Sequence, residues 1–263
     1  MNQIRKYPRT PHLLDSKIQA GDAGLRVADF GEIVGRYLVI EEKVDGANAG
    51  LSFDTGGELR LQSRGHYLTG GPRERHFAPF KAWAAALRQQ LWERIGTRYV
   101  VYGEWLHAKH TIFYDDLPAW FLEFDVLDLD ADQFLATSAR RALLRGLPIH
   151  SVPVLHEGTI DRPATMLRFL ARSAYKSDSW RERLAAAASS PPHRPETVAE
   201  QTDSSDLMEG LYVKVEERGV VTARYKYVRQ DFLSRVQDSE SHWHDRPILP
   251  NGIRVRADGA RQS

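Results

Sequence analysis

The sequence contains no cysteine among its 263 residues. This absence excludes disulfides, thiolate metal sites and cysteine nucleophiles together, so covalent catalysis would need Lys, Ser, Thr, Asp, Glu, His or Tyr. The sequence also has little net charge, because 36 lysines and arginines stand against 35 aspartates and glutamates. The whole-chain charge therefore does not predict a nucleic-acid partner, and any such binding must come from local basic patches.

Long apolar runs are absent as well. No segment is long enough to span a bilayer, and no apolar segment near the N-terminus resembles a signal peptide. We therefore expect a cytoplasmic protein with no membrane partner. The 42% hydrophobic and 27% charged residues are ordinary for a globular protein, and a chain of this length can bury a full core. We expect one domain over residues 1–263.

The spacing of apolar and turn residues predicts an α+β fold. Glycine turns at Gly56-Gly57 and at Gly219 mark two hairpins, and one apolar stripe fits a helix over residues 77–95. Strands in hairpins with helices scattered between them favour twisted, mainly antiparallel sheets flanked by helices over alternating βαβ units. The expected strands are Arg36–Lys43, Ala47–Phe53, Glu58–Arg64, Arg98–Leu106, Trp120–Leu129, Gly210–Glu216 and Val220–Val228.

Further helices are predicted over residues 138–144 and from starts at Asp161 and Ser177. Residues 188–206 are rich in serine, proline and charge, which predicts a mobile surface loop. The polar tail after Pro250 predicts a frayed end.

Five segments place a charged residue at the end or in the middle of an apolar strand. Such a residue is costly to bury unless it is paired, so it is usually surface-facing or functional. In chain order these segments are Lys43-Val44-Asp45-Gly46 with Asn48, Ser63-Arg64, Gly103-Glu104, Phe124-Asp125, and Glu209-Gly210 through Lys214 followed by Arg224 and Lys226.

Each segment alone also fits an ordinary structure. Lys43 could be a solvated strand end before an Asp-Gly turn, and Phe124 could be a plain core residue. Arg224 and Lys226 are two residues apart and so share one face of a strand, as they would on any solvated surface. The functional hypothesis therefore depends on the order of the whole set rather than on one motif.

In this order and spacing the segments resemble the covalent nucleotidyltransferase superfamily, and most closely the ATP-dependent RNA ligase family. Within that family the resemblance is to the branch of the second RNA ligase of phage T4 and the trypanosome editing ligases. The family pattern runs K-x-[DHN]-G-x-N, S-R, a Glu after an apolar strand, an aromatic before Asp, E-G-x-x-x-K and a closing basic pair. The resemblance covers residues 43–226. Arg224 stands where lysine is common in the family, which keeps the positive charge but replaces an ammonium by a forked guanidinium. Glu123, inside an apolar strand, has no firm role in the family pattern.

The resemblance implies an ATP-grasp-like nucleotidyltransferase domain and a three-step reaction. Lys43 attacks ATP to form lysyl-AMP, AMP moves to the 5′-phosphate of an RNA, and a 3′-hydroxyl then seals the strand. Lysine must attack as a neutral amine, whereas an unperturbed lysine with a pKa near 10.4 is neutral only about once in 2,500 molecules at neutral pH. We expect Lys214, Arg224, Lys226 and a bound Mg²⁺ to lower the pKa of Lys43.

The resemblance also implies ATP and Mg²⁺, or Mn²⁺, as cofactors, with Glu209 holding or orienting the metal. The implied nucleotide contacts are the backbone at Glu42 along the adenine, Phe124 stacked on the adenine, Glu104 on a ribose hydroxyl, Asn48 and Arg64 on the ribose or phosphate side, and Lys214, Arg224 and Lys226 on the phosphates.

The length of chain after the last motif bears on the substrate. Only 37 residues of the 263 follow Lys226, too few for the OB-type domain of DNA ligases and capping enzymes, so we expect no C-terminal OB domain. The resemblance then implies an RNA ligase in RNA repair, acting on nicked duplex or broken ends, with an end-healing kinase or phosphatase as a further partner. The alternatives are a transferase for DNA ends or 5′-diphosphate ends and a non-catalytic nucleotide-responsive RNA-binding module.

Overall fold

The computed structural model describes residues 4–18, 22, 24–232 and 247–254. Twelve strands of this part of the chain join in one sheet, whose main path runs β10-β3-β11-β12-β8-β7-β6-β4-β5. The strands are β1 His12–Leu13, β2 Val27–Ala28, β3 Leu38–Lys43, β4 Ala47–Phe53, β5 Leu59–Ser63, β6 Tyr99–Trp105, β7 Phe121–Asp128, β8 Gln133–Leu135, β9 His150–Ser151, β10 Val154–Gly158, β11 Gly210–Glu217 and β12 Val220–Val228.

Every pairing along the main path is antiparallel. The parallel pairs are β1 with β12, β1 with β2, and β7 with β9. The predicted α+β class with a mainly antiparallel sheet is therefore confirmed. All seven predicted strands are present within a few residues of their expected bounds, because period-two alternation and glycine turns are local properties of the chain.

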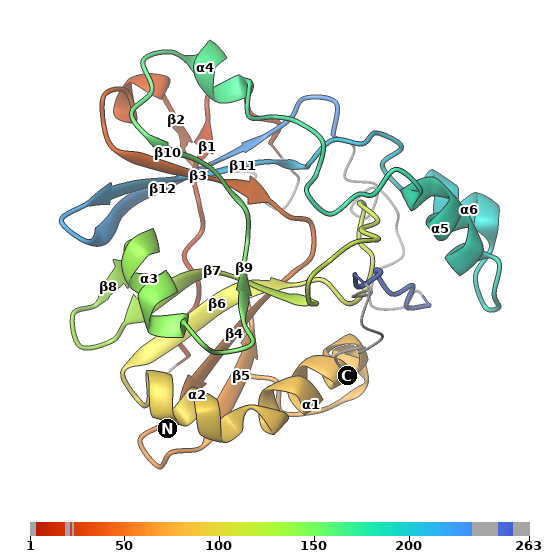
Figure 1. Ribbon diagram of the computed structural model, residues 1–263, viewed down its shortest axis with the longest axis horizontal. Coiled ribbons are helices and arrows are strands. Elements are labelled where there is room, and N and C mark those ends of the chain that lie inside the picture. The colour runs from red at the N-terminus through yellow and green to blue at the C-terminus, as the bar shows by residue number, and fades with distance from the viewer. Residues whose placement is uncertain (1–3, 19–21, 23, 233–246, 255–263) are drawn as a thin grey trace.

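The sheet is divided into two halves. Strands β10, β3, β11 and β12 form one half, β7, β6, β4 and β5 form the other, and the three-residue strand β8 connects them between β12 and β7. Figure 1 shows the halves above and below one another, with β8 and α3 at one side. Strand β3 lies between β10 and β11, which explains why the side chains of Leu38, Val39 and Ile40 are all fully buried.

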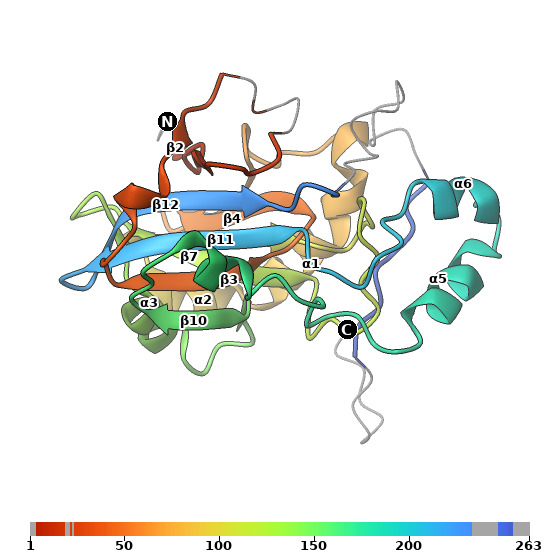
Figure 2. The same cartoon turned by 90° about the horizontal axis from the view of Figure 1, so that it is seen from above.

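The helices between the strands are short. They are the 3-10 helices η2 Phe30–Glu32 and η3 Pro72–Phe77, and the α-helices α1 Ala78–Ala86, α2 Arg88–Ile95, α3 Thr137–Leu144, α4 Pro163–Leu167, α5 Trp180–Ala188 and α6 Pro195–Glu200. Helices α1 and α2 pack Phe80, Leu91 and Ile95 into the hydrophobic core of the lower half, while α5 and α6 project at one end of the molecule (Figures 1 and 2). In the described ranges no helix is long and apolar enough to cross a membrane.

Two expectations need correction. The helix predicted over residues 77–95 is two helices that meet at Leu87, whose φ of −96° and ψ of 2° are not helical. The apolar stripe passes through this kink without interruption, so its period could not reveal it. The stretch 188–206, predicted as a loop, contains α6. Edge strand β10 was not predicted.

The segment after Pro250 is also more ordered than predicted, as far as residue 254. The side chain of Asn251 accepts a hydrogen bond from the Tyr114 amide at 2.9 Å and donates one to the Leu106 carbonyl at 2.7 Å. Ile253 forms a bridge with Leu117. Asn251 is buried because its amide satisfies backbone groups that would otherwise lack partners. Residues 255–263 lie outside the described part of the chain.

Candidate active site

A cavity of about 1090 Å³, here called the central cavity, lies between the two halves of the sheet. Its walls come from β3, β4, β6, β7, β11 and β12, together with the N-terminal segment and η3. Of the ten residues predicted to form the site, eight line this cavity: Glu42, Lys43, Asn48, Arg64, Glu104, Phe124, Glu209 and Lys226. The structure thus brings together residues that are up to 184 positions apart in the chain, from 42 to 226.

Lys43 lies at the end of β3, where the sheet register places Gly210 opposite it. This register brings Glu209 beside Lys43, and the lysine Nζ donates to a Glu209 carboxylate oxygen at 2.6 Å. The Lys43 side chain is 23% exposed, whereas that of Glu209 is 2% exposed. The lysine amine is therefore reachable from the cavity, while the carboxylate beneath it is covered.

The electrostatic surroundings of Lys43 differ from the expectation. Burial pulls the pKa of Lys43 down, but the carboxylates of Glu209 and Glu104 more than offset burial and raise the pKa above its ordinary value. We had expected cations to dominate and to lower it. The reason is that two of the three expected cations lie elsewhere, while Glu209 contacts the amine directly.

Glu104 and Asn48 face each other on neighbouring strands, since the register pairs Asn48 of β4 with Glu104 of β6. Burial raises the pKa of Glu104 to about 8, and the opposing effect of Lys43 cancels only part of that shift. Asn48 keeps a buried side-chain oxygen that accepts no hydrogen bond within the described chain. A buried acceptor without a donor in a cavity wall is the arrangement that a bound polar ligand would complete.

Glu42 and Phe124 line the same cavity from β3 and β7. The Glu42 carboxylate accepts from the Ser173 hydroxyl at 2.5 Å and from the Ala174 amide at 3.0 Å, and burial raises its pKa to about 7. The Phe124 ring lies 5.0 Å from Tyr7 and 6.3 Å from Tyr212, centroid to centroid. These aromatic rings form an apolar wall suited to a flat base.

Arg64 is exposed on the cavity lining just past the end of β5. On the opposite side Lys226 forms a buried ion pair with Asp22, and His12 lies 3.2 Å from the same carboxylate. Burial lowers the pKa of Lys226 despite its pairing with Asp22. Sequence reasoning missed Asp22, because a lone aspartate in a glycine-rich loop resembles any turn residue.

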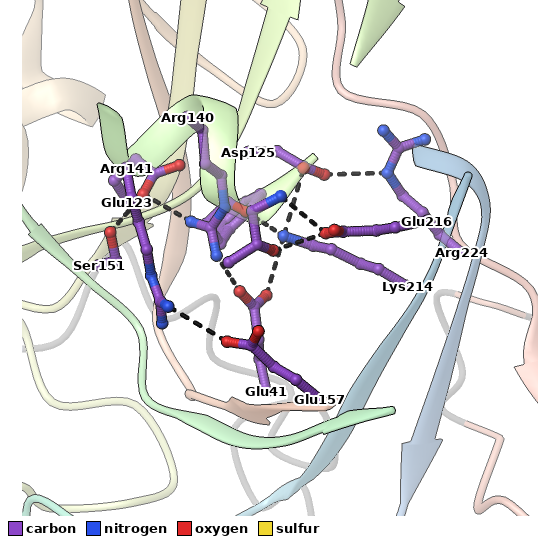
Figure 3. Close-up of polar contacts among 12 residues, drawn as sticks. Glu41, Glu123, Asp125, Arg140, Arg141, Ser151, Glu157, Lys214, Glu216 and Arg224 are labelled. Atoms are coloured by element: carbon purple, nitrogen blue, oxygen red, sulfur yellow. Dashed lines mark hydrogen bonds and ion pairs between the residues drawn. The ribbon is translucent and has the colours of Figure 1, made fainter. Parts of the chain in front are cut away.

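Two predicted residues, Lys214 and Arg224, lie outside the cavity in what we call the buried ion network (Figure 3). Lys214 is fully buried, with its Nζ 2.9 Å from Glu41 and 3.2 Å from Asp125 and also donating to the Phe124 carbonyl. Arg224 donates to Asp125 at 2.9 Å and lies over the Phe134 ring at 3.7 Å. Their expected phosphate contacts are therefore corrected to structural ion pairs.

The network is completed by Arg140, which donates to Glu123 at 2.6 Å and to Glu41. Three carboxylates thus meet three cations: Glu41, Glu123, Asp125, Arg140, Lys214 and Arg224. Sequence reasoning missed the pairing of Arg140 with Glu41 and Glu123. The available signal was Glu123, since an acid in the middle of an apolar strand demands a buried partner.

The buried ion network contacts the wall of the central cavity. Lys214 donates a hydrogen bond to the carbonyl of Phe124, whose ring lines the cavity. Tyr7, which also lines the cavity, donates to Asp125 of the network at 2.6 Å. The Tyr7 hydroxyl also lies 2.6 Å from the Tyr212 hydroxyl, another wall residue. Buried ion pairs of this kind constrain the positions of the strands that carry them.

Residues 36–228 match the model of the RNA ligase family. Among solved structures, an apo mutant of a Naegleria gruberi RNA ligase is 18% identical, with a TM-score of 0.49 over 76% of this chain and 51% of that one. A mutant of a Naegleria gruberi RNA ligase with ATP and Mn is 16% identical, with a TM-score of 0.48 over 76% and 52%.

An archaeal ATP-dependent RNA ligase is 18% identical, with a TM-score of 0.47 over 86% of this chain and 48% of that one. The chain therefore spans about half the length of these solved ligases. A search of the curated proteins finds no match.

Proposed function

This chain belongs to the RNA ligase family, and from that premise we propose that it is an ATP-dependent RNA ligase that acts through a covalent lysyl-AMP. The observation that carries the proposal is the position of Lys43. Its amine is accessible at the wall of a cavity of about 1090 Å³, hydrogen-bonded to a covered carboxylate. A cavity of this size accommodates a nucleotide triphosphate.

Before the first step the Lys43 ammonium must lose one proton, and Glu209, 2.6 Å from Nζ, is the group placed to accept it. The neutral amine then attacks the α-phosphorus of ATP, and the nitrogen–phosphorus bond forms as the bond from that phosphorus to the pyrophosphate oxygen breaks. The second proton of the nitrogen leaves to solvent, which gives the neutral phosphoramidate nitrogen of lysyl-AMP. Lys226 lines the cavity and supplies positive charge for the phosphates.

The donor set fits a hard divalent cation that is shared with the substrate. Glu209 would hold it, and it would supply positive charge against the triphosphate. In the described part of the chain no group of three or more potential ligands could hold a metal alone. Magnesium characteristically needs only one or two protein carboxylates when phosphates complete its coordination. The carboxylate of Glu209 therefore suffices for this role.

We further propose that the adenine enters beside Phe124 and the backbone of Glu42, and that Glu104, Asn48 and Arg64 contact the ribose and phosphates. Glu104 would donate as well as accept, because its raised pKa keeps it protonated at neutral pH. The substrate would be a 5′-phosphate and a 3′-hydroxyl RNA end in RNA repair. Where breakage leaves a 5′-hydroxyl or a 3′-phosphate instead, a kinase or a phosphatase would first have to convert that end.

The test is incubation with α-labelled ATP and Mg²⁺ followed by a denaturing gel, for the wild type and Lys43→Ala. We expect a labelled band in the wild type alone, and intact-protein mass to show AMP on the unlabelled wild type wherever it is already charged. Addition of a nicked RNA duplex should discharge the band and yield a sealed strand.

Other outcomes would redirect the assignment. Label from GTP in preference to ATP would support a transferase for 5′-diphosphate ends, and sealing of DNA alone would make the protein a DNA ligase. If uncharged wild type accepted no label from either nucleotide, the chain would be a nucleotide-responsive binding module and the ligase assignment would be abandoned.

A further inference from the structure

We propose that a second cavity, here called the basic cavity, binds the phosphate backbone of the polynucleotide whose end enters the central cavity. This inference rests on the proposed ligase function for its substrate. The basic cavity has a volume of about 250 Å³. Its lining is formed by η3, the loop after β6, the start of α6 and the segment 247–249, which are distant in sequence.

The charge of this lining is one-sided. Arg75, Lys109 and Arg194 contribute three permanent positive charges, three histidines add donors, and no aspartate or glutamate is among the described residues of the lining. The chain as a whole carries a net charge of only +1, so three cations in one small lining are a local concentration. Such a wall attracts a polyanion while the rest of the surface does not.

The two cavities are adjacent at His110, which lines both of them. They also share η3, because Glu74 lines the central cavity and Arg75 lines the basic one. A strand that leaves the central cavity past His110 therefore enters a basic wall directly. An RNA on this path would carry its terminal phosphate toward Lys43.

The basic cavity is built by specific contacts. The Lys109 amide donates to the Leu249 carbonyl at 2.8 Å, and the Asn251 amide donates to the His107 carbonyl at 2.9 Å, so the C-terminal segment is fastened to the loop. The Lys109 Nζ donates to the carbonyls of His110 and Gln201 at 2.9 and 3.0 Å. Both acceptors are backbone carbonyl oxygens, so these two contacts orient the ammonium at the cavity wall.

The chemistry of the lining suits a nucleotide chain better than a free anion. Beside the cations, Thr197 and Gln201 offer hydrogen-bonding groups, and Pro192, Ile248 and Leu249 offer an apolar surface. Cationic and apolar groups in one groove match the alternating phosphates and bases of a single strand. A small anion would contact only the cationic groups.

The experiment measures binding without chemistry. A short 5′-phosphorylated, fluorescent single-stranded RNA is titrated by anisotropy in buffer without ATP or Mg²⁺, at several salt concentrations. The variant is the double substitution Arg75→Glu and Arg194→Glu. The matched control is Arg145→Glu and Arg168→Glu, which makes the same charge change at exposed arginines after α3 and α4, away from α6 (Figure 1).

We expect the Kd for RNA to rise about tenfold or more in the basic-cavity variant at low salt, and the slope of log Kd against log salt to fall by about 1.4, two lost contacts on a single strand. The control should change the Kd much less. Charging of Lys43 with labelled AMP should persist in both variants, because neither substitutes a residue of the central cavity. The single variant Arg194→Ala, at an exposed position, repeats the test where the double variant unfolds.

Three results would overturn the proposal. They are an unchanged Kd in the basic-cavity variant, an equal loss in the control, and displacement of the RNA by pyrophosphate with the same strength in wild type and variant. A matched DNA strand tests whether recognition depends on the 2′-hydroxyl. Failure of the ligase assignment would show instead as absent AMP charging in the wild type, while the anisotropy measurement would still report on the basic cavity.

Discussion

Lys226 and Arg224 are two residues apart on β12 and share one face of the sheet, yet they belong to different regions. Lys226 lines the central cavity, whereas Arg224 is paired with Asp125 in the buried ion network. The same step on β3 leads from the accessible Lys43 to Glu41, which also lines the cavity but whose fully buried side chain is paired within the network. One face thus carries reactive charge at one end and structural ion pairs at the other.

The two regions also differ in the balance of their charges. Around Lys43, burial raises the pKa of Glu104 to about 8, with Glu209 and Asp45 adding to the shift and Lys43 offsetting only part of it. In the network three carboxylates meet three cations, and Lys214 and Arg224 overcome burial to hold the pKa of Asp125 below its usual range. Unbalanced buried charge favours chemistry and ligand binding, while balanced charge favours a fixed structure.

The largest effect should come from breaking the network at its centre. Arg140→Met leaves Glu41 and Glu123 buried without their shared cation, and we expect the free energy of unfolding to fall by about 3–5 kcal/mol. Urea denaturation measures it. The adjacent Arg141→Met is the matched control, because its exposed pair with Glu157 at 3.2 Å should contribute less than about 0.5 kcal/mol. Equal losses in the two variants would remove the distinction between buried and surface charge.

A pair of lysine substitutions sharpens the comparison. Lys214→Met should lower the free energy of unfolding by about 2 kcal/mol, since Asp125 keeps Arg224 and Glu41 keeps Arg140. It should leave AMP charging largely intact at low temperature.

Lys226→Met should do the reverse. We expect charging to slow by about tenfold or more because a cation beside the phosphates is lost, with a stability loss of about 1 kcal/mol, since Asp22 keeps His12 at 3.2 Å. Charging rates and unfolding midpoints of both variants test this opposite pair of effects. Slower charging in Lys214→Met than in Lys226→Met, at equal folded fraction, would mean that Lys214 rather than Lys226 binds the phosphates and would contradict the comparison.

The smallest effect is a difference in pH dependence. Glu104 has a folded pKa of about 8, above its unfolded value, so its protonated form stabilises the fold fully below about 4.3, and that stability is lost as the pH rises through about 8. Asp125 has a lowered pKa, so its contribution is present above about 3.9 and is lost on further acidification. Glu104→Gln should flatten the loss of stability between about pH 4.3 and pH 8 in urea midpoints, and it should leave the acid loss that Asp125 causes unchanged. Equal slopes of stability against pH in wild type and variant over that range would contradict the assignment.

Much of the site could be predicted because the signals are local. The alternation that marks β4 and the turn that follows it depend only on neighbouring residues, and β4 matches its predicted bounds at Ala47 and Phe53. The order of charged strand ends then places eight of ten predicted residues on one cavity. The kink at Leu87 and the docking of Asn251 could not be predicted, because each depends on contacts with distant segments.

The sequence by itself determined which residues share a strand face and in what order the reactive groups occur, since both follow from period-two geometry along a single strand. Only the tertiary structure decided which partner each group meets. Arg224 pairs with Asp125 because β7 brings that carboxylate against it, and Lys43 faces Glu209 because β11 pairs with β3 in one register. Pairing and burial together set the role of each group, so the same kind of charge becomes a binding group at one end of the face and a structural ion at the other.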